Sequence, residues 1–376
     1  MNKEIGIYIH IPFCRRKCFY CDFVSFENED KQEKYIEALI KEIEYWKEKN
    51  KDKKIKTIYI GGGTPSFINS KDIIKIIKKL EPTEECKEIT IEVNPGTVNK
   101  EKLLDYKNAG INRVSIGLQS TKNELLHEIG RIHNFDEFMK TYHLVKEVGF
   151  KNVNVDLMIG LPNQTLKDVE DSLEEIVKLN VNHVSVYSLI IEEGTKLYTK
   201  INNGELKLPE EELERKMYWK VKRYLESKGY KHYEISNFAK EGYESKHNFD
   251  CWNQKEYKGF GLAAHSYIND IRFSNICDLN SYIENIEKGN FEKNIVIEER
   301  KQTKEEKQKE YMLLGLRKID GIKITDFENK FNVSINIFKN EIEKLLDEKL
   351  IVKNNECIKL SNKGIDLANM VWEEFI

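Results

Sequence analysis

Apolar and polar positions along the chain change their period at regular intervals. Residues 5–11 read IGIYIHI, an alternation of period two that predicts a β-strand, and the apolar side chains of residues 31–48 recur at helical spacing. The same change from strand to helix occurs six times before residue 230. The strands are predicted at residues 5–11, 55–60, 88–93, 113–118, 153–159 and 183–190, each followed by one or two helices. Six such units in succession predict a parallel sheet with right-handed crossovers.

Polar residues and glycines gather where the predicted strands end. A cysteine loop follows the first strand and a triple glycine follows the second, while Glu92, Gln119 and Asp156 stand at or near the ends of later strands. In a barrel these ends form one rim, where groups from separate strands converge. An open doubly wound sheet would also place a site beyond its strand ends, and it remains the alternative. We predict an α/β fold, a partial (β/α)6 TIM-like barrel that is open on one side.

The pattern changes again after residue 300. Three short helices, a hairpin and a closing helix follow one another, which is the order of a winged-helix-like α+β domain. Residues 301–376 hold 14 Lys/Arg and 14 Asp/Glu, so they lack the basic stripe that binding to duplex DNA needs. The expected organisation is a barrel in residues 1–230, a connecting region with the HNxxxW and GLAAHSY motifs in 231–300, and a smaller C-terminal domain in 301–376.

The composition indicates in which compartment the protein resides and which partners it can bind. A net charge of −3 over 376 residues gives no general attraction to nucleic acid. No apolar run approaches the roughly 20 residues of a membrane span, and the first residues lack the layout of a signal peptide. Seven cysteines, of which only three are clustered, suit a reducing cytosol better than a disulfide framework. We therefore predict a cytoplasmic protein that binds no nucleic acid.

The three clustered cysteines, Cys14, Cys18 and Cys21, form the pattern C-x3-C-x2-C directly after the first strand. Three soft thiolates on so short a loop can hold three irons of a [4Fe–4S] cube and leave the fourth open to an exchangeable ligand. A tetrahedral zinc site would need a fourth ligand, and Phe23 occupies the expected place. Three structural thiols, or a zinc loop completed from a distance, are the alternatives. The residues favour an iron–sulfur cluster.

This cysteine motif resembles that of the radical S-adenosylmethionine (SAM) superfamily. The segments YIHIPFC, GGGTPS, EVNPGT, SIGLQS, VDLMIGLP and GLAAHSY, in this order, resemble the oxygen-independent coproporphyrinogen III oxidase group. The continuation Cys21-Asp22-Phe23 is similar to the haem-chaperone branch of the group, whereas the oxidases continue with C-x-C. The oxidases also carry a longer segment before the motif. Both differences point away from decarboxylation of propionates.

The resemblance implies the ligands of the site. In the superfamily a [4Fe–4S] cluster binds SAM through its open iron, which makes Cys14, Cys18 and Cys21 the metal ligands. Glycines let the backbone approach a ligand closely, and a carboxylate at the end of an apolar strand is costly to bury without a partner. The residues expected to contact SAM are Tyr8, Gly62, Gly63, Thr64, Glu92, Gln119, Arg131 and Asp156. In the oxidases some of the last of these touch a second SAM, so their ligand here stays open.

A haem ligand is expected further along, at residues 246–252. Haem chaperones of the branch carry H-N-x-x-Y-W there, and this chain reads HNFDCW, with Cys251 in place of the tyrosine. The resemblance implies that His247 is an axial ligand of haem, because imidazole binds haem iron well. A cysteine thiolate could compete for the iron, and a histidine that only packs in the core is the alternative to both.

The function that the resemblance implies is a haem chaperone that binds haem and a SAM-ligated [4Fe–4S] cluster and transfers haem to acceptor proteins. The alternatives are an oxygen-independent coproporphyrinogen III oxidase and other radical SAM chemistry on a tetrapyrrole. We assign no catalytic residue, and whether the protein is an enzyme stays open. Its expected partners are haem, unidentified haem acceptors and an electron donor such as flavodoxin or ferredoxin, and peripheral contact with a membrane is compatible with the sequence.

Overall fold

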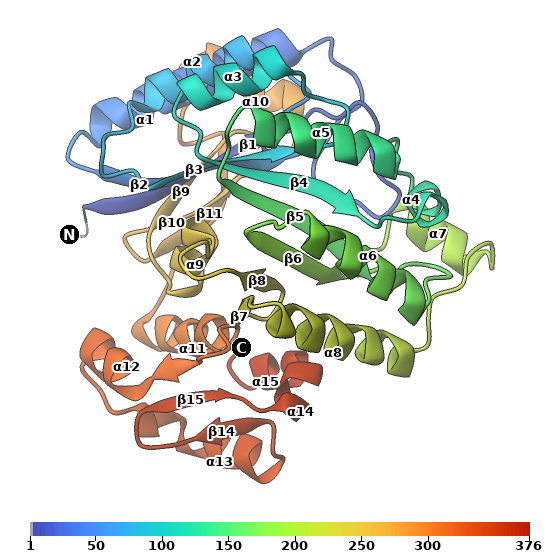
Figure 1. Cartoon of the computed structure of the whole chain (residues 1–376). Coiled ribbons are helices and arrows are strands. Elements are labelled where there is room, and N and C mark those ends of the chain that lie inside the picture. The colour runs from blue at the N-terminus through green and yellow to red at the C-terminus, as the bar shows by residue number, and fades with distance from the viewer. Residues whose placement is uncertain (1–2) are drawn as a thin grey trace.

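A parallel sheet of six strands forms the centre of the fold (Figure 1). The computed structural model describes residues 3–376. Strands β1 to β6 lie side by side in chain order, each parallel to the next. Their bounds are β1 Glu4–Ile11, β2 Lys54–Gly62, β3 Glu88–Val93, β4 Arg113–Gln119, β5 Asn152–Ile159 and β6 His183–Ser188. Because the strand order never reverses, the sheet has no switch point, which rules out the doubly wound alternative.

Helices cover the outer face of this sheet. The helix α1 packs against α2, α2 against α3, α3 against α5, and α6 against α8. Their bounds are α1 Gln32–Lys49, α2 Ser70–Leu80, α3 Lys100–Asn108, α4 Asn123–Glu128, α5 Phe135–Glu147, α6 Leu166–Lys178, α7 Lys196–Asn202 and α8 Glu211–Ser227. Isoleucine and valine side chains of the strands fill the space beneath the helices. The predicted partial (β/α)6 barrel is confirmed.

Residues 231–300 extend the same sheet at both edges. Strand β9 runs parallel to β1 and is followed outward by β10, β11 and β12, while β8 and β7 continue the sheet beyond β6. The bounds are β7 Lys231–Glu234, β8 Asn237–Ala239, α9 Lys246–Trp252, β9 Tyr257–Phe260, β10 His265–Ile268, β11 Ile271–Asn275, α10 Leu279–Glu287 and β12 Val296–Lys301. We predicted no elements in this region, so these strands are a finding of the structure.

The C-terminal part has a core of its own, separate from that of the barrel. It consists of α11 Lys304–Gly315, β13 Ile322–Lys323, α12 Ile324–Phe331, the 3₁₀ turn Ile335–Phe338, α13 Lys339–Asp347, β14 Ile351–Lys353, β15 Cys357–Leu360, α14 Asn362–Asp366 and α15 Ala368–Glu373. A three-stranded sheet in the order β13-β15-β14 supplies the wing. The predicted winged-helix-like order is confirmed, although the closing helix is divided at Leu367.

The short helix α9 lies between the two cores. It packs against β2, on the side of the sheet away from α1, α2 and α3, and against α11 of the C-terminal part (Figure 1). Its first residues are held by the carboxylate of Glu88, which accepts hydrogen bonds from the backbone N–H groups of Lys246 and His247 at 2.9 and 3.1 Å. The HNxxxW motif therefore connects the barrel to the C-terminal part.

Candidate functional site

The cysteine loop is fastened at both of its ends and in the middle. The N–H of Cys14 donates to the carbonyl of Phe26 at 2.9 Å, and the N–H of Phe26 donates to that of Pro12 at 2.7 Å. In the middle, Phe19 donates to Ile129 at 2.9 Å and accepts from Leu197 at 2.8 Å. The loop is therefore held in place at the rim by groups from distant parts of the chain.

Cys14, Cys18 and Cys21 line one cavity at this rim, together with Gly62, Gly63, Thr64, Glu92, Gln119, Arg131 and Asp156. Burial raises the pKa of the Cys14 thiol, and burial with the neighbouring Cys18 raises that of Cys21 to about 11. Within residues 3–376 no three His, Cys, Asp or Glu side chains already stand together as a metal site. The donor set nevertheless fits a cluster, because iron binds thiolates and displaces their protons.

The glycine turn after β2 lies directly against the cysteine loop. Gly63 donates to the carbonyl of Ile11 at 2.8 Å, and the N–H of Thr64 donates to that of Phe13 at 2.9 Å. The hydroxyl of Thr64 lies 3.3 Å from Sγ of Cys14. Gly62 has a φ of 109°, and a Cβ at this position would stand 2.6 Å from the His10 ring. Only glycine fits there, so the turn can present backbone groups to a ligand.

Arg131 is held between the cysteine loop and β4. Its guanidinium donates to Asn94 Oδ1 at 2.8 Å and to the carbonyl of Gly117 at 2.6 Å, and its Nη1 lies 3.4 Å from Sγ of Cys18. The sequence did not single out Asn94. Its amide also donates to the Thr64 hydroxyl at 2.8 Å, so it links the glycine turn to the arginine. An asparagine before a proline reads as an ordinary turn residue, and only the fold brings it to the site.

Two carboxylates face the interior of the barrel. Glu92 accepts a 2.7 Å hydrogen bond from the Tyr59 hydroxyl, and burial raises its pKa to about 7. Asp156 accepts from the Asn154 amide at 2.7 Å and from the Ser115 hydroxyl at 3.2 Å, and burial raises its pKa as well. Two neighbouring buried acids whose pKa values are raised by burial, even with Arg113 nearby, favour a ligand that brings positive charge or hydroxyl donors.

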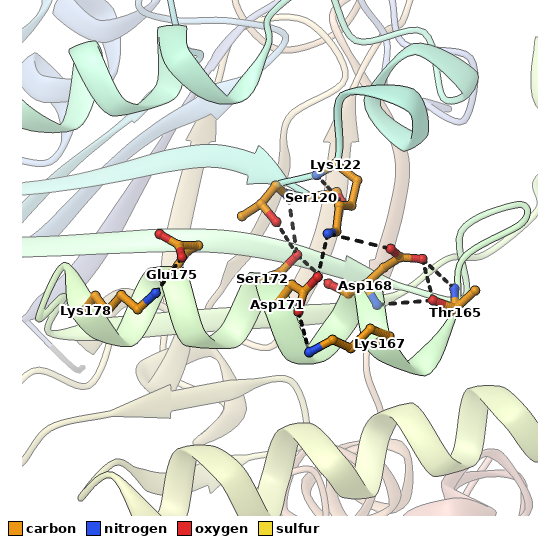
Figure 2. A network of polar contacts seen from close by, with 10 residues as sticks. Ser120, Lys122, Thr165, Lys167, Asp168, Asp171, Ser172, Glu175 and Lys178 are labelled. Carbon is orange, nitrogen blue, oxygen red and sulfur yellow. Dashed lines mark hydrogen bonds and ion pairs between the residues drawn. The ribbon is translucent and has the colours of Figure 1, made fainter.

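The loop that carries Gln119 is fixed to α6 (Figure 2). Lys122 forms a 2.6 Å ion pair with Asp171, and the backbone N–H of Lys122 donates to the Ser120 hydroxyl at 3.1 Å. The hydroxyl of Ser172 lies 2.9 Å from that of Thr121. Gln119 itself has a φ of 72°, and its side-chain Oε1 is buried with no partner within residues 3–376. An unpaired acceptor in a rigid loop fits a site that receives a donor from a ligand.

Tyr8 lies apart from the other predicted contacts. Its hydroxyl is 3.1 Å from Nδ1 of His10, and its ring stacks on that of Tyr59 at 6.3 Å between centroids. It is absent from the lining of the cavity that holds the three cysteines. The other predicted cluster and SAM residues meet there, while Tyr8 faces the interior from a neighbouring position.

His247 lies near the opposite end of the strands. Its Nδ1 is 2.9 Å from the Thr57 hydroxyl, its ring centroid is 5.5 Å from that of Tyr59, and burial lowers its pKa to about 4. Thr57 precedes Gly62 by five residues on β2, which corresponds to about 16 Å along a strand. His247 therefore lies away from the rim that carries the three cysteines. Burial raises the pKa of the Cys251 thiol to about 12, which leaves it protonated at neutral pH.

Comparison with known proteins places this geometry in a family. Residues 8–176 match the model of the radical SAM superfamily, and residues 302–367 match that of the HemN C-terminal domain. The chain is 38% identical to "Heme chaperone HemW" of Bacillus subtilis, and the alignment covers 98% of each chain. It is 35% identical to "Heme chaperone HemW" of Lactococcus lactis, with 100% of this chain and 98% of that chain covered. The solved structure of coproporphyrinogen III oxidase (HemN) from Escherichia coli superposes with a TM-score of 0.86 at 20% identity, covering 99% of this chain and 90% of that chain, which shows a shared fold.

The fold and the cysteine loop define a radical SAM protein. At 38% identity over nearly its whole length, the chain belongs to the HemW family of haem chaperones. Among residues 3–376 no helix is both long and apolar enough to span a membrane.

Proposed function

We propose that this protein is a haem chaperone, which binds haem, carries a SAM-ligated [4Fe–4S] cluster and passes haem to acceptor proteins. The family to which the chain belongs supports this function. The observation that supports haem binding at a particular residue is the environment of His247. Its Nδ1 is tied to Thr57, and no residue between 3 and 376 forms a hydrogen bond with its Nε2. A histidine that ligates a metal is typically fixed in this way through its other ring nitrogen.

The protonation state of His247 supports the same role. A pKa lowered to about 4 keeps the imidazole neutral at pH 7, so a lone pair is available to iron. The protonated thiol of Cys251 is a poor competitor, because the thiolate is the form that binds metals. We therefore propose His247 Nε2 as the axial ligand.

At the rim, Cys14, Cys18 and Cys21 would hold the cluster, and Gly62, Gly63 and Thr64 would present backbone groups to SAM. The remaining proposed contacts to SAM are Glu92, Gln119, Arg131 and Asp156. Tyr8 lies outside this cavity and forms a hydrogen bond with His10. A [4Fe–4S] cluster held by these cysteines would supply the electron for reductive chemistry on SAM. We propose a cytoplasmic location, a protein electron donor and haem acceptors of unknown identity.

One anaerobic experiment tests this function against oxidase activity. The reconstituted protein is mixed with haem, then with an apo-protein acceptor such as an apo-cytochrome b, and haem transfer is followed by the shift of the Soret band. The same preparation is incubated with coproporphyrinogen III and SAM. We expect haem binding and transfer without consumption of coproporphyrinogen. Decarboxylation of coproporphyrinogen in the absence of haem transfer would overturn the proposal in favour of an oxidase.

A further inference from the structure

A cavity of about 670 Å³ opens between the edge of the barrel and the C-terminal part. It lies beside β6, α8 and β8 on the barrel and α14 and α15 on the other side, with α9 at its wall. Its volume is in the range of sites for cofactors and other small molecules. Its lining includes Tyr187, Trp252, Arg317, Met370 and Trp372.

Arg317 lies in the wall of this cavity between two indole rings. Its guanidinium carbon is 4.4 Å from the centroid of the Trp252 ring and 4.8 Å from that of Trp372. Trp252 comes from α9 and Trp372 from α15, so the stack joins the HNxxxW motif to the C-terminal part. Flat aromatic faces on both sides fix the plane of the guanidinium and leave its edge free to bind.

The N–H groups of this stack have no acceptors. Nε of Arg317 and both indole Nε1 atoms are buried without a hydrogen-bond partner within residues 3–376. Over the same residues no ion pair reaches the guanidinium. A buried guanidinium without an acceptor is costly, because its N–H groups have lost water and gained no hydrogen bond in return. Three orphan donors at one place in a cavity wall point to an anionic acceptor that the protein itself does not supply.

The other arginine of the cavity is different. Arg215 is paired with Glu211 at 2.8 Å and lies 4.0 Å from Asp366, which also accepts from the indole of Trp219 at 2.7 Å. Its charge is already used within the fold. Glu234 is close enough to act electrostatically on Arg317; its Oε1 accepts from Ser236 and Asn237, and its Oε2 is buried without a hydrogen-bond partner within residues 3–376. Of the two arginines in this cavity, Arg317 is thus the one without an ion pair within the described residues, although Glu234 lies within electrostatic reach.

Exposed apolar and aromatic side chains complete the wall. The exposed fraction is 41% for Tyr187 and 47% for Met370, although both lie beside the cavity. A ligand that covered them would gain buried apolar area, while Arg317 would bind its charged edge. This combination suits a large flat apolar molecule with a carboxylate at its rim.

We infer that the cavity binds a porphyrin and that Arg317, held between Trp252 and Trp372, binds one of its propionates. This inference rests on the proposed function, since the porphyrin is the haem that the chaperone carries. The proposed function does not say where the macrocycle lies or which residue recognises its propionates. Here the macrocycle lies in this cavity, and Arg317 distinguishes a porphyrin with free propionates from one without them. Asn248 and Trp252 of α9 line this cavity, whereas His247 of the same helix lies against Thr57 of β2 and is not part of the lining.

The test compares haem with its dimethyl ester, which keeps the iron and the ring but lacks both carboxylates. Each is titrated into the full-length protein and followed by absorption, for the wild type, Arg317→Met, Arg317→Lys and Arg215→Met. The wild type should bind haem at least tenfold more tightly than the ester, as expected for charge-assisted hydrogen bonds to a carboxylate. Arg317→Met should bind the two within about twofold of one another, Arg317→Lys should keep part of the preference, and Arg215→Met should keep all of it.

A merely structural role of the stack would lower the melting temperature of Arg317→Met without changing the preference for the diacid. Equal binding of haem and ester by the wild type would overturn the inference and leave haem binding intact. Binding of neither by the wild type would overturn the proposed function, and the inference with it. In His247→Ala the preference for the diacid should remain, because His247 does not line the cavity.

Discussion

The hydroxyl of Tyr59 donates a 2.7 Å hydrogen bond to Oε1 of Glu92 on the neighbouring strand. The ring of Tyr59 also packs against the ring of His247, and the two ring centroids are 5.5 Å apart. One tyrosine thus stands between a carboxylate of the proposed SAM site and the proposed ligand of haem. Although the two sites lie at opposite ends of the strands, they share a wall inside the barrel.

The first prediction concerns this hydrogen bond. Tyr59→Phe removes the donor that favours the charged form of Glu92, so the pKa of Glu92 should rise above its present value of about 7. SAM should then bind about 5–50-fold more weakly at pH 7, as measured by calorimetry on the reconstituted protein. Tyr106→Phe is the control, because its buried hydroxyl has no partner within residues 3–376. Unchanged SAM affinity in Tyr59→Phe would remove Glu92 from the site.

The second prediction follows from the pKa of Glu92 itself. Burial raises this pKa from 4.5 to about 7, so between these values the folded protein holds a proton that the unfolded chain has released. The free energy of unfolding must therefore fall as the pH rises from about 4.5 to 7 and then level off. The loss due to this one group is on the order of 3 kcal/mol.

Urea unfolding of the protein without its cofactors, at pH 5 and pH 8, measures this effect. Glu92→Gln has no proton to lose, so relative to the wild type it should gain about 2–3 kcal/mol of stability between the two pH values. Groups that do not interact with Glu92 titrate alike in both proteins and cancel in the comparison, so the neighbouring Asp156 is the one coupled acid that contributes to the difference. If the two proteins show the same change between pH 5 and 8, Glu92 is ionised throughout and its burial is less complete than the structure indicates.

The residues at the strand ends could be predicted from the sequence, because the strand pattern and the polar residue or glycine that follows it are both local features of the chain. A strand of alternating or buried residues fixes where the chain meets the rim, and a glycine or acid just beyond it marks the site. Glu92 and Asp156 lie in this way, and both line the cavity of the three cysteines. Asn94 and Tyr59 do not stand out locally, since their importance lies in hydrogen bonds to Arg131 and Glu92 across the sheet.

The edge strands could not be predicted for a related reason. The strands β7 and β8 have four and three residues, and KHYE has no clear alternation of polar and apolar positions. Such strands form because an edge of the barrel is available for pairing. The place of His247 was missed for the same reason, because Thr57 and Glu88, which hold it, are 190 and 159 residues away in the sequence.

The third prediction uses two glycines with positive φ. Gly62→Ala must distort the turn, since the new Cβ would stand 2.6 Å from the His10 ring, whereas Gly204→Ala meets nothing within 4 Å. Both changes share the backbone strain of about 1 kcal/mol. Only Gly62→Ala should weaken SAM binding, by more than tenfold, because it alone moves backbone groups of the proposed site. Equal effects of the two substitutions on calorimetric SAM binding would show that the turn does not touch SAM.

The fourth prediction concerns the cluster. Substitution of Cys14, Cys18 or Cys21 by Ala should each abolish a stable four-iron cluster after anaerobic reconstitution, because every thiolate holds one iron. Iron and sulfide analysis and the absorption near 400 nm, roughly the region of iron–sulfur charge transfer, measure the loss. Cys86→Ala is the control, since this thiol lies 3.7 Å from the Glu88 carbonyl, away from the cavity of the other three. Full iron content in Cys18→Ala would reject the assignment.

The last prediction asks which side chain ligates haem. His247→Ala should alter the Soret band and weaken haem binding, because it removes a neutral imidazole whose Nδ1 is already fixed by Thr57. Thr57→Val keeps the imidazole but frees its ring to rotate, so it should weaken haem binding by about 10-fold, as the loss of a partner behind a metal ligand commonly does.

Cys251→Ser should leave the spectrum unchanged at neutral pH, since a thiol with a pKa of about 12 is not a thiolate there. Absorption and electron spin resonance distinguish imidazole from thiolate ligation. A spectrum that changes in Cys251→Ser and not in His247→Ala would make cysteine the ligand.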